Sequence, residues 1–252
     1  MDNQDKTNAL IVGASRGIGL GFVKVLLKKR NFKIYATYRQ ENLATELFDL
    51  KREYPQQLHC LPLDITNEEQ ISNLSNCIQG KESQLHLVVN CVGILHEESL
   101  QPEKSLRQIS SEKLLYYFQV NSIGSVLLAK HLLPLFRHPN GSVLACLSAK
   151  LGSIGDNYLG GWYGYRSSKA ALNMLMRNVA IEYKRLCPHT IVVTLHPGTT
   201  ATNLSKPFQK NVPKEKLFSV ERTVNQLLDV IDNLTESDSG LFFSWDGTRL
   251  PW

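Results

Sequence analysis

Two side chains of opposite acid–base character stand four residues apart in the segment Tyr165-Arg166-Ser167-Ser168-Lys169. The apolar residues that follow recur with the period of a buried helical face, which predicts a helix from Tyr165 onward. On this helix Tyr165 and Lys169 lie one turn apart on the same side. A free tyrosine has a pKa of about 10, and a lysine cation held close to it lowers that value. The pair is therefore a candidate general acid–base for a carbonyl or an alcohol, the alternative being a tyrosine half in the core and a lysine in water.

A glycine-rich turn, Gly13-Ala14-Ser15-Arg16-Gly17-Ile18-Gly19, follows a predicted buried strand at 7–12 and precedes a helical pattern that reaches Leu27. Such a turn lets backbone N–H groups approach a phosphate, and the helix N-terminus favours the negative charge. The glycine spacings are four and two, so the usual G-x-G-x-x-G pattern is absent. The turn indicates a dinucleotide phosphate site, with simple packing of a strand on a helix as the alternative.

The second predicted strand, 32–38, ends in Tyr38-Arg39. In dinucleotide-binding folds an acidic residue at this point bonds the ribose 2′-hydroxyl. Here Arg39 and the Arg16 of the glycine turn stand in its place, and guanidinium groups pair with phosphate through forked hydrogen bonds. The two arginines favour NADP(H) over NAD(H), unless both are ordinary surface residues.

The rest of the chain alternates between strand and helix patterns. Further strands are predicted at 58–64, 85–90, 142–147, 190–195 and 240–244. Residues 199–219 contain two prolines and no regular pattern, which predicts an irregular, mobile cover over a site. The alternation predicts one α/β domain over residues 1–252, a doubly wound parallel sheet of seven strands with helices on both faces.

Composition excludes several classes of protein. The 252 residues are 42% apolar, enough for one sizeable core, and the net charge of +5 is scattered apart from Lys28-Lys29-Arg30, so no nucleic-acid partner is predicted. No run of about 18 apolar residues exists, so no membrane span is predicted. The polar start is unlike a secretion signal, and the five cysteines form no C-x-x-C pair. These features predict a cytoplasmic protein with reduced thiols and no metal site.

Chemically distinctive residues recur along the chain in one order. They are Gly13, Gly17, Gly19, Asp64, Asn90, Gly93, Asn121, Ser148, Tyr165, Lys169 and Pro197-Gly198. In this order and at these approximate positions, the chain resembles the short-chain dehydrogenase/reductase family over nearly its whole length. The tail from Trp245 to Trp252 also resembles the subgroup of sniffer-type carbonyl reductases and bacterial C-factor proteins.

The resemblance implies a role for each catalytic candidate. Tyr165 would give a proton to a carbonyl oxygen or take one from an alcohol. Lys169 would lower the pKa of that phenol and hold the nicotinamide ribose. Ser148 would hydrogen-bond the substrate oxygen, and Asn121 would help to hold a water relay behind Lys169. The implied cofactor contacts are Gly13, Ser15, Arg16, Gly17, Ile18, Gly19, Tyr38, Arg39, Asp64, Ile65, Asn90, Gly93, Tyr165, Lys169, Pro197, Gly198, Thr199 and Thr202.

The implied activity is NADP(H)-dependent reduction of a small-molecule ketone or aldehyde, or oxidation of the corresponding alcohol. A homodimer or homotetramer that pairs through the helices near 105–137 and 163–186 is also expected. A cofactor-binding signalling protein of the C-factor type, with little turnover, is the alternative. Two departures from the family pattern lie near the cofactor: Val12 stands where threonine is common, and Cys91-Val92 replaces Asn-Ala.

Overall fold

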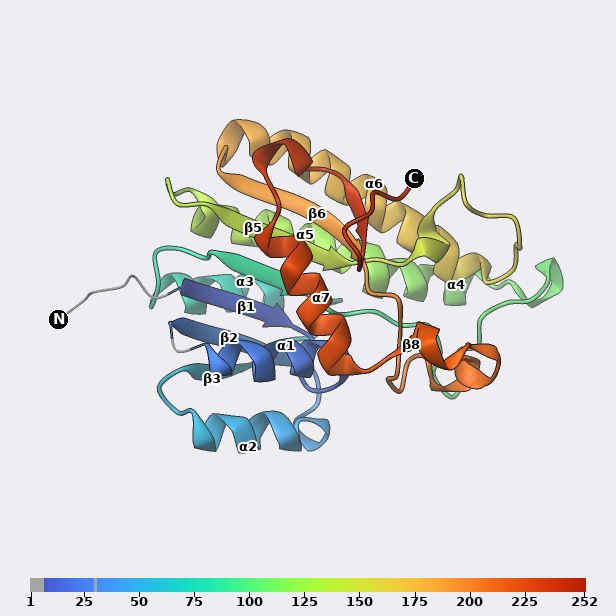
Figure 1. The fold of residues 1–252 in the computed structure, drawn as a ribbon, viewed down its shortest axis with the longest axis horizontal. Coiled ribbons are helices and arrows are strands. Elements are labelled where there is room, and N and C mark those ends of the chain that lie inside the picture. The colour runs from blue at the N-terminus through green and yellow to red at the C-terminus, as the bar shows by residue number, and fades with distance from the viewer. Residues whose placement is uncertain (1–6, 30) are drawn as a thin grey trace.

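The computed structural model describes residues 7–29 and 31–252, so the expectations for the polar start and for Arg30 lie outside the described residues. Seven parallel strands form the main sheet in the order β3-β2-β1-β4-β5-β6-β9 (Figure 1). Their bounds are β1 Thr7–Val12, β2 Phe32–Tyr38, β3 Leu58–Pro62, β4 Leu87–Asn90, β5 Ser142–Leu147, β6 Thr190–His196 and β9 Phe242–Ser244. The predicted doubly wound α/β fold is confirmed, with β3, β4 and β9 shorter than predicted.

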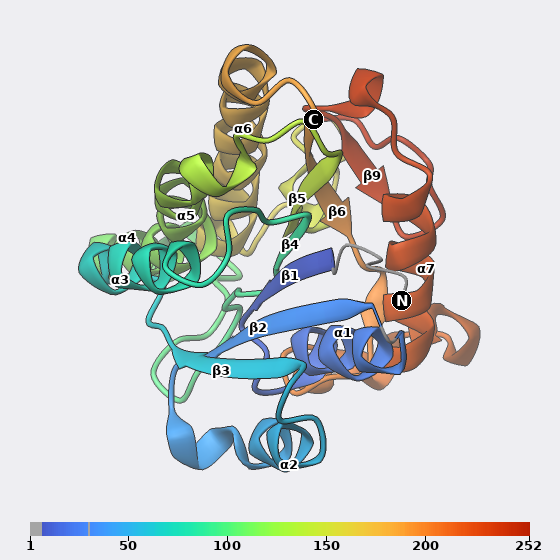
Figure 2. The ribbon, with the colours of Figure 1, turned by 90° about the vertical axis from the view of Figure 1, so that its left-hand side faces the viewer.

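Helices cover both faces of the sheet (Figure 2). One layer holds α1 Gly17–Lys28, α2 Thr45–Glu53 and α7 Val220–Asp232; the other holds α3 Glu68–Gln79, α4 Ser111–Phe118, α5 Gly124–Leu132 and α6 Tyr163–Leu186. Alternate residues of β1 serve the two cores, since Leu10 and Val12 join the α3–α6 side while Ala9 and Ile11 join the α1 side. Burial on both faces explains why this strand reads as a continuous apolar run.

Local signals explain some of the helix boundaries. The side chain of Asn67 accepts a hydrogen bond from Gln70 N and caps α3, as expected for Asn at this position. The helix α6 begins at Tyr163, two residues earlier than the apolar period indicated. The helix α2 was not predicted, because its only buried residue is Leu47 and its apolar period is correspondingly weak.

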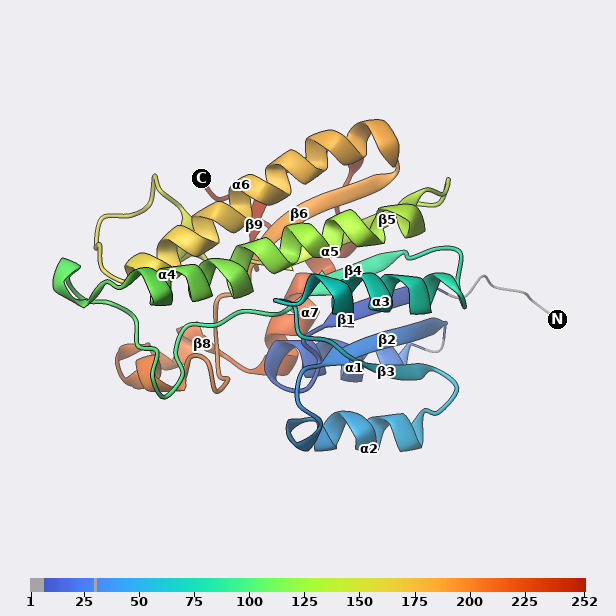
Figure 3. The same cartoon turned by 180° about the vertical axis from the view of Figure 1, so that it is seen from behind.

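The helix α4 continues through a π-helical turn, Gln119–Ile123, into α5 and ends in the 3-10 turn Leu133–Phe136 (Figure 3). Single π turns inside helices are frequent at functional sites. The turn contains Asn121, whose side chain is buried.

Residues 199–219 are more regular than predicted. β7 Thr199–Thr200 pairs in parallel with β8 Leu217–Phe218, and two 3-10 helices, Lys206–Asn211 and Lys214–Lys216, lie between them. The pairing joins the two ends of the segment. Strands of two residues are too short to show a periodic pattern, so the sequence did not predict them. Among the helices of the described chain, none has the length and apolarity needed to cross a bilayer.

Candidate active site

A cavity of about 790 Å³ opens at the carboxyl ends of β1 and β4, where the strand order of the sheet reverses. Ligands of doubly wound sheets collect at such a switch point, and the volume suits a cofactor with a substrate. The cavity brings together most of the candidates taken from the sequence. Those that line it are Gly13, Ser15, Arg16, Gly17, Ile18, Gly19, Arg39, Asp64, Ile65, Gly93, Ser148, Tyr165, Lys169, Pro197 and Thr202.

Hydrogen bonds from β2 shape the glycine turn. Gly13 N–H donates to Thr37 Oγ1 at 3.0 Å, and Ala14 N–H donates to Thr37 O at 2.7 Å. A Cβ on Gly19 would lie 2.2 Å from Gly13 O, so only glycine permits this close approach. The sequence gave no signal for Thr37, which lies inside an ordinary strand.

The N-terminus of α1 is left open towards the cavity. Arg16 is its N-cap residue, and within the described chain no side chain of the cap accepts from the first turn, which also lacks an acidic residue. Free N–H groups and the positive end of the helix dipole attract a phosphate. The turn and helix therefore fit the pyrophosphate of a dinucleotide. A nicotinamide dinucleotide bound there would supply hydride transfer.

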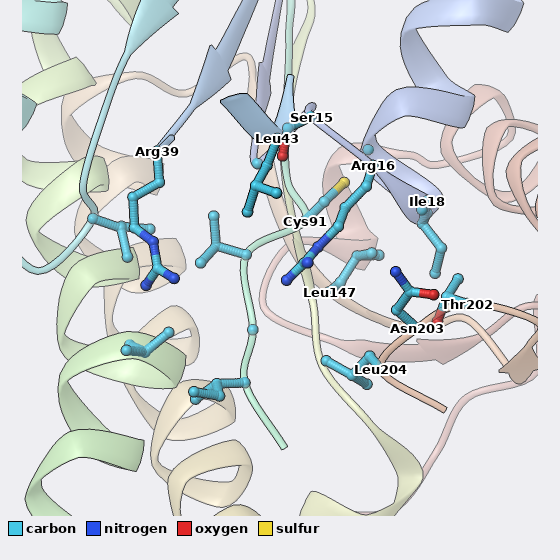
Figure 4. A pocket seen from close by; sticks show the side chains of 18 of the residues that line it. Ser15, Arg16, Ile18, Arg39, Leu43, Cys91, Leu147, Thr202, Asn203 and Leu204 are labelled. Atoms are coloured by element: carbon cyan, nitrogen blue, oxygen red, sulfur yellow. The ribbon is translucent and has the colours of Figure 1, made fainter. Parts of the chain in front are cut away.

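Two guanidinium groups extend into the same cavity, those of Arg16 and Arg39 (Figure 4). Arg39 Nη2 lies 3.7 Å from Glu97 Oε1, and Glu97 also lines the cavity. The sequence analysis missed Glu97, because it belongs to an irregular connector with no motif. Tyr38, in contrast, packs against the ring of Phe48 at 5.0 Å between centroids and does not line the cavity.

The acid–base pair of α6 is buried at the floor of the cavity. Lys169 Nζ donates to Leu147 O at 2.8 Å and lies 5.9 Å from the ring centroid of Tyr165. In the described part of the chain, the Tyr165 hydroxyl makes no hydrogen bond, so it is available to a ligand. Burial raises the pKa of Tyr165 and lowers the pKa of Lys169 to about 8. The lowered phenol pKa predicted from the sequence is therefore not found, because the burial of Tyr165 dominates over the lysine charge 5.9 Å from its ring centroid.

Asn121 lies beside this pair rather than in the cavity lining. Its Oδ1 accepts from Ile94 N at 2.7 Å, and its Nδ2 donates to Ile94 O and to Ser168 Oγ, both at 3.0 Å. A Cβ on Gly93 would lie 3.3 Å from Lys169 Nζ and 3.4 Å from Asn121 Oδ1. Asn121 thus fixes the connector after β4 against α6, directly next to the lysine.

Ser148 is held by a residue that the sequence analysis did not select. Its hydroxyl donates to Asn173 Oδ1 at 2.7 Å, and both side chains are buried. The Nδ2 of Asn173 has no hydrogen-bond partner in the described chain. In this arrangement the Ser148 proton is directed to α6, so a bond to a substrate oxygen requires that the Ser148–Asn173 bond be exchanged.

The remaining candidates support the cavity from behind. Asn90 Oδ1 accepts from Val92 N at 3.0 Å, and Asn90 Nδ2 donates to Ser125 Oγ at 2.9 Å, which holds the turn after β4. Gly198 packs so closely that a Cβ would lie 2.6 Å from the Phe218 ring. Asn90, Gly198 and the exposed Thr199 do not line the cavity.

Residues 7–213 match the profile of the family described as short chain dehydrogenase. The chain belongs to this family. The short-chain dehydrogenase is accordingly an oxidoreductase.

Solved structures and a curated relative agree with this membership. The NADPH-bound carbonyl reductase from chicken fatty liver is 30% identical, with a TM-score of 0.87 over 98% of this chain and 99% of that one. The carbonyl reductase Sniffer of Drosophila melanogaster is also 30% identical, with a TM-score of 0.86 over 98% and 100%. The C-signal protein of Myxococcus xanthus is 34% identical over 136 residues, which are 54% of this chain and 76% of that protein.

Proposed function

We propose that this short-chain dehydrogenase reduces a ketone or an aldehyde with NADPH, or oxidises the corresponding alcohol with NADP⁺. One observation carries the proposal: the unbonded Tyr165 hydroxyl and the buried Lys169 meet in a single cavity with the open glycine turn. When bound, the cofactor supplies the hydride. The chain supplies the proton and the electrostatic environment.

Tyr165 is the proposed proton donor to the substrate oxygen. Lys169 keeps its proton below a pH of about 8, and its ammonium group favours the phenolate that forms when Tyr165 gives its proton away. Lys169 is held by its bond to Leu147 O. Asn121, which the π-helical turn contributes, lies beside it across Gly93. Ser148 is the proposed second ligand of the substrate oxygen, after its hydroxyl leaves Asn173.

The proposed preference for NADP(H) rests on Arg16 and Arg39, which both extend into the cavity. A 2′-phosphate carries the charge that two guanidinium groups can pair with, and a 2′-hydroxyl does not. The chicken carbonyl reductase is described as bound to NADPH, which supports the same choice of cofactor here.

The test is the Tyr165→Phe variant, assayed by NADPH oxidation against diketones, quinones and aldehydes. Loss of a general acid costs roughly 10²- to 10⁴-fold in kcat. NADPH should still bind, as measured by quenching of intrinsic fluorescence, since the ring of residue 165 is kept. The matched control is Tyr163→Phe on the same helix, which should keep its activity. Near-normal kcat for Tyr165→Phe would refute the proposal.

A second candidate function follows from the likeness to the C-signal protein of Myxococcus xanthus. In that case the chain would bind a cofactor and signal, with little turnover. The same screen separates the two functions: NADPH binding without NADPH oxidation on any carbonyl tested would favour signalling.

A further inference from the structure

A buried carboxylate holds the start of the helix that carries Tyr165. Glu103 lies in the connector between β4 and α4 and is 1% exposed. Its Oε2 accepts from Gly164 N–H at 3.1 Å, and its backbone oxygen accepts from Trp162 N–H at 2.5 Å. Its Oε1 is buried and has no partner in the described chain. One residue thus makes two bonds to the chain just before Tyr165.

The segment that these bonds hold has an unusual backbone. Gly160, Gly161 and Trp162 all have left-handed conformations, with φ of 64°, 68° and 51°. Two glycines accept this at little cost, but a bulky aromatic residue in this region is strained. Trp162 is therefore held in place by its surroundings, and its N–H bond to Glu103 is one of the contacts that hold it.

The Glu103 side chain also caps the N-terminal end of α6. The helix has no acidic residue in its first turn, and its N-cap residue, Trp162, offers no capping side chain. A carboxylate from a distant part of the chain supplies both the missing acceptor and the negative charge that a helix N-terminus favours. The Glu103 side chain thus lies where the free N–H groups of a helix N-terminus need an acceptor.

Close packing around the carboxylate leaves it little freedom. A Cβ on Gly164 would lie 2.3 Å from Tyr117 Cδ2 and 3.0 Å from Glu103 Oε1. The Trp162 ring packs against the rings of Tyr165 and Phe208, with centroids 6.3 and 4.7 Å away. A shift of Glu103 is therefore passed to the ring next to the proposed proton donor.

We propose that Glu103 is a positioning residue for Tyr165: by capping α6 and holding Trp162, it sets where the phenol hydroxyl stands in the cavity. The inference rests on the proposed function, because it takes Tyr165 to be the proton donor. Glu103 does not line the cavity and touches neither substrate nor cofactor residues of the glycine turn. It acts through the helix, so it should govern kcat and leave the affinity for the cofactor unchanged.

The experiment compares Glu103→Ala, Glu103→Asp and Glu103→Gln with Glu112→Ala, an exposed acidic residue in the first turn of α4. Hydrogen–deuterium exchange of the peptide 160–168 reports the capping bond without any need for activity. Loss of a hydrogen bond to a charged group is worth roughly 1.5–3 kcal/mol, so exchange in the Ala and Asp variants should speed up by about tenfold or more. The Gln variant can still accept from Gly164 N–H and should stay protected, as should the control.

Kinetics then test positioning. In the Ala and Asp variants kcat, expressed per NADPH-binding site, should fall by about tenfold, since a displacement of about 1 Å is costly in an active site. The NADPH dissociation constant should stay within about twofold of the parent, and the Gln variant should recover most of kcat. The Asp variant keeps the charge but is one methylene shorter, so it reports reach separately from charge.

Several outcomes would overturn the inference. They are full kcat per site in the Ala or Asp variant, unchanged exchange of 160–168 in both, or a rise in the NADPH dissociation constant that accounts for the lost activity. Equal loss of kcat in the Gln variant would also overturn it, because charge rather than placement would then matter. If the Ala variant does not fold, the Asp and Gln pair decides. Absence of turnover in the parent protein would instead refute the proposed function, and the exchange data would still judge the capping bond.

Discussion

The buried charge of Lys169 lowers the stability of the folded state. It is 3% exposed, and its ammonium group makes one hydrogen bond, to Leu147 O. Burial lowers its pKa from 10.5 to about 8, so the folded state binds its proton less tightly than the unfolded state. Between those two values the unfolded chain holds more protons, and the stability of the protein rises with pH across that window.

Lys169→Met should therefore abolish turnover and stabilise the protein at pH 7. Removal of the buried charge should raise the free energy of unfolding by roughly 3 kcal/mol, and loss of the bond to Leu147 O should lower it by about 1 kcal/mol or more. A net gain of about 1–2 kcal/mol in the free energy of unfolding is expected from urea titration, shrinking as the pH approaches 10.5. Lys184→Met, an exposed lysine near the end of the same helix, is the control. A less stable Lys169→Met at every pH would contradict this account of the lysine.

Cofactor choice is a second property of single residues. Arg39 forms an ion pair with Glu97 at 3.7 Å, so the Glu97 carboxylate competes with a phosphate for the Arg39 guanidinium. Both side chains are partly exposed, so solvent screens the pair and its own contribution to stability is small.

Arg39 and Glu97 should consequently shift NADPH binding in opposite directions. Arg39→Ala, alone and with Arg16→Ala, should weaken NADPH by about tenfold or more and NADH by much less, since each charged hydrogen bond is worth roughly 1.5–3 kcal/mol. Glu97→Gln should tighten NADPH and leave NADH unchanged. Fluorescence titration of both cofactors checks each variant. Equal loss of NADPH and NADH in the double arginine variant would rule out a 2′-phosphate site.

At the scale of elements, the segment 199–219 is fastened over the cavity from two sides. His96 Nε2 lies 3.3 and 3.1 Å from the backbone oxygens of Asn203 and Leu204. Phe208 packs its ring against His96 and Trp162, with centroids 5.8 and 4.7 Å away. The segment therefore links the connector after β4 to the start of α6.

Phe208→Ala should loosen this cover and raise the KM for the carbonyl substrate. An aromatic pair contributes roughly 0.5–1.5 kcal/mol beyond its buried area, which corresponds to an increase of about fivefold. The NADPH dissociation constant should change little, because Phe208 itself does not line the cavity. Phe208→Tyr keeps the ring and should restore the parent KM. An unchanged KM in the alanine variant would show that the cover does not take part in substrate binding.

At the scale of the molecule, the α4–α6 layer presents apolar side chains to solvent. Leu115 on α4 and both Met174 and Ile181 on α6 are 53–63% exposed. The two helices lie side by side on one face of the sheet (Figure 3). Exposed apolar groups gathered on one layer are typical of an association surface, in line with the homodimer or homotetramer expected from the family resemblance.

Carboxylates introduced on the α4–α6 layer should prevent the expected association of the protein. Met174→Glu with Ile181→Glu places two carboxylates on α6, and a monomer mass is expected from light scattering, because buried unpaired charges are costly at an interface. Leu159→Glu makes the same change at an exposed position in the loop before α6 and should keep the parent mass. A monomeric parent protein, or an unchanged mass in the double variant, would contradict the expectation.

The sequence by itself determined the sheet, the glycine turn and the pairing of Tyr165 with Lys169. These features are local: a strand buried on both faces is a continuous apolar run, and a four-residue spacing on a helix places two side chains on one side. The N-cap of α3 is local in the same sense, because Asn67 accepts from the backbone N–H three residues further on. Local signals failed for α2 and for β7–β8, where one buried leucine and strands of two residues leave hardly any pattern.

Only the tertiary structure decided which residues hold the functional side chains in place. Glu103 caps a helix 61 residues away, Asn173 accepts a hydrogen bond from Ser148 25 residues away, and Glu97 reaches Arg39 from the connector after another strand. The burial that lowers the Lys169 pKa likewise comes from the whole fold. Contacts between residues so far apart in the chain leave no period or spacing in a single sequence, because their geometry is set by how the layers pack and not by any local backbone preference.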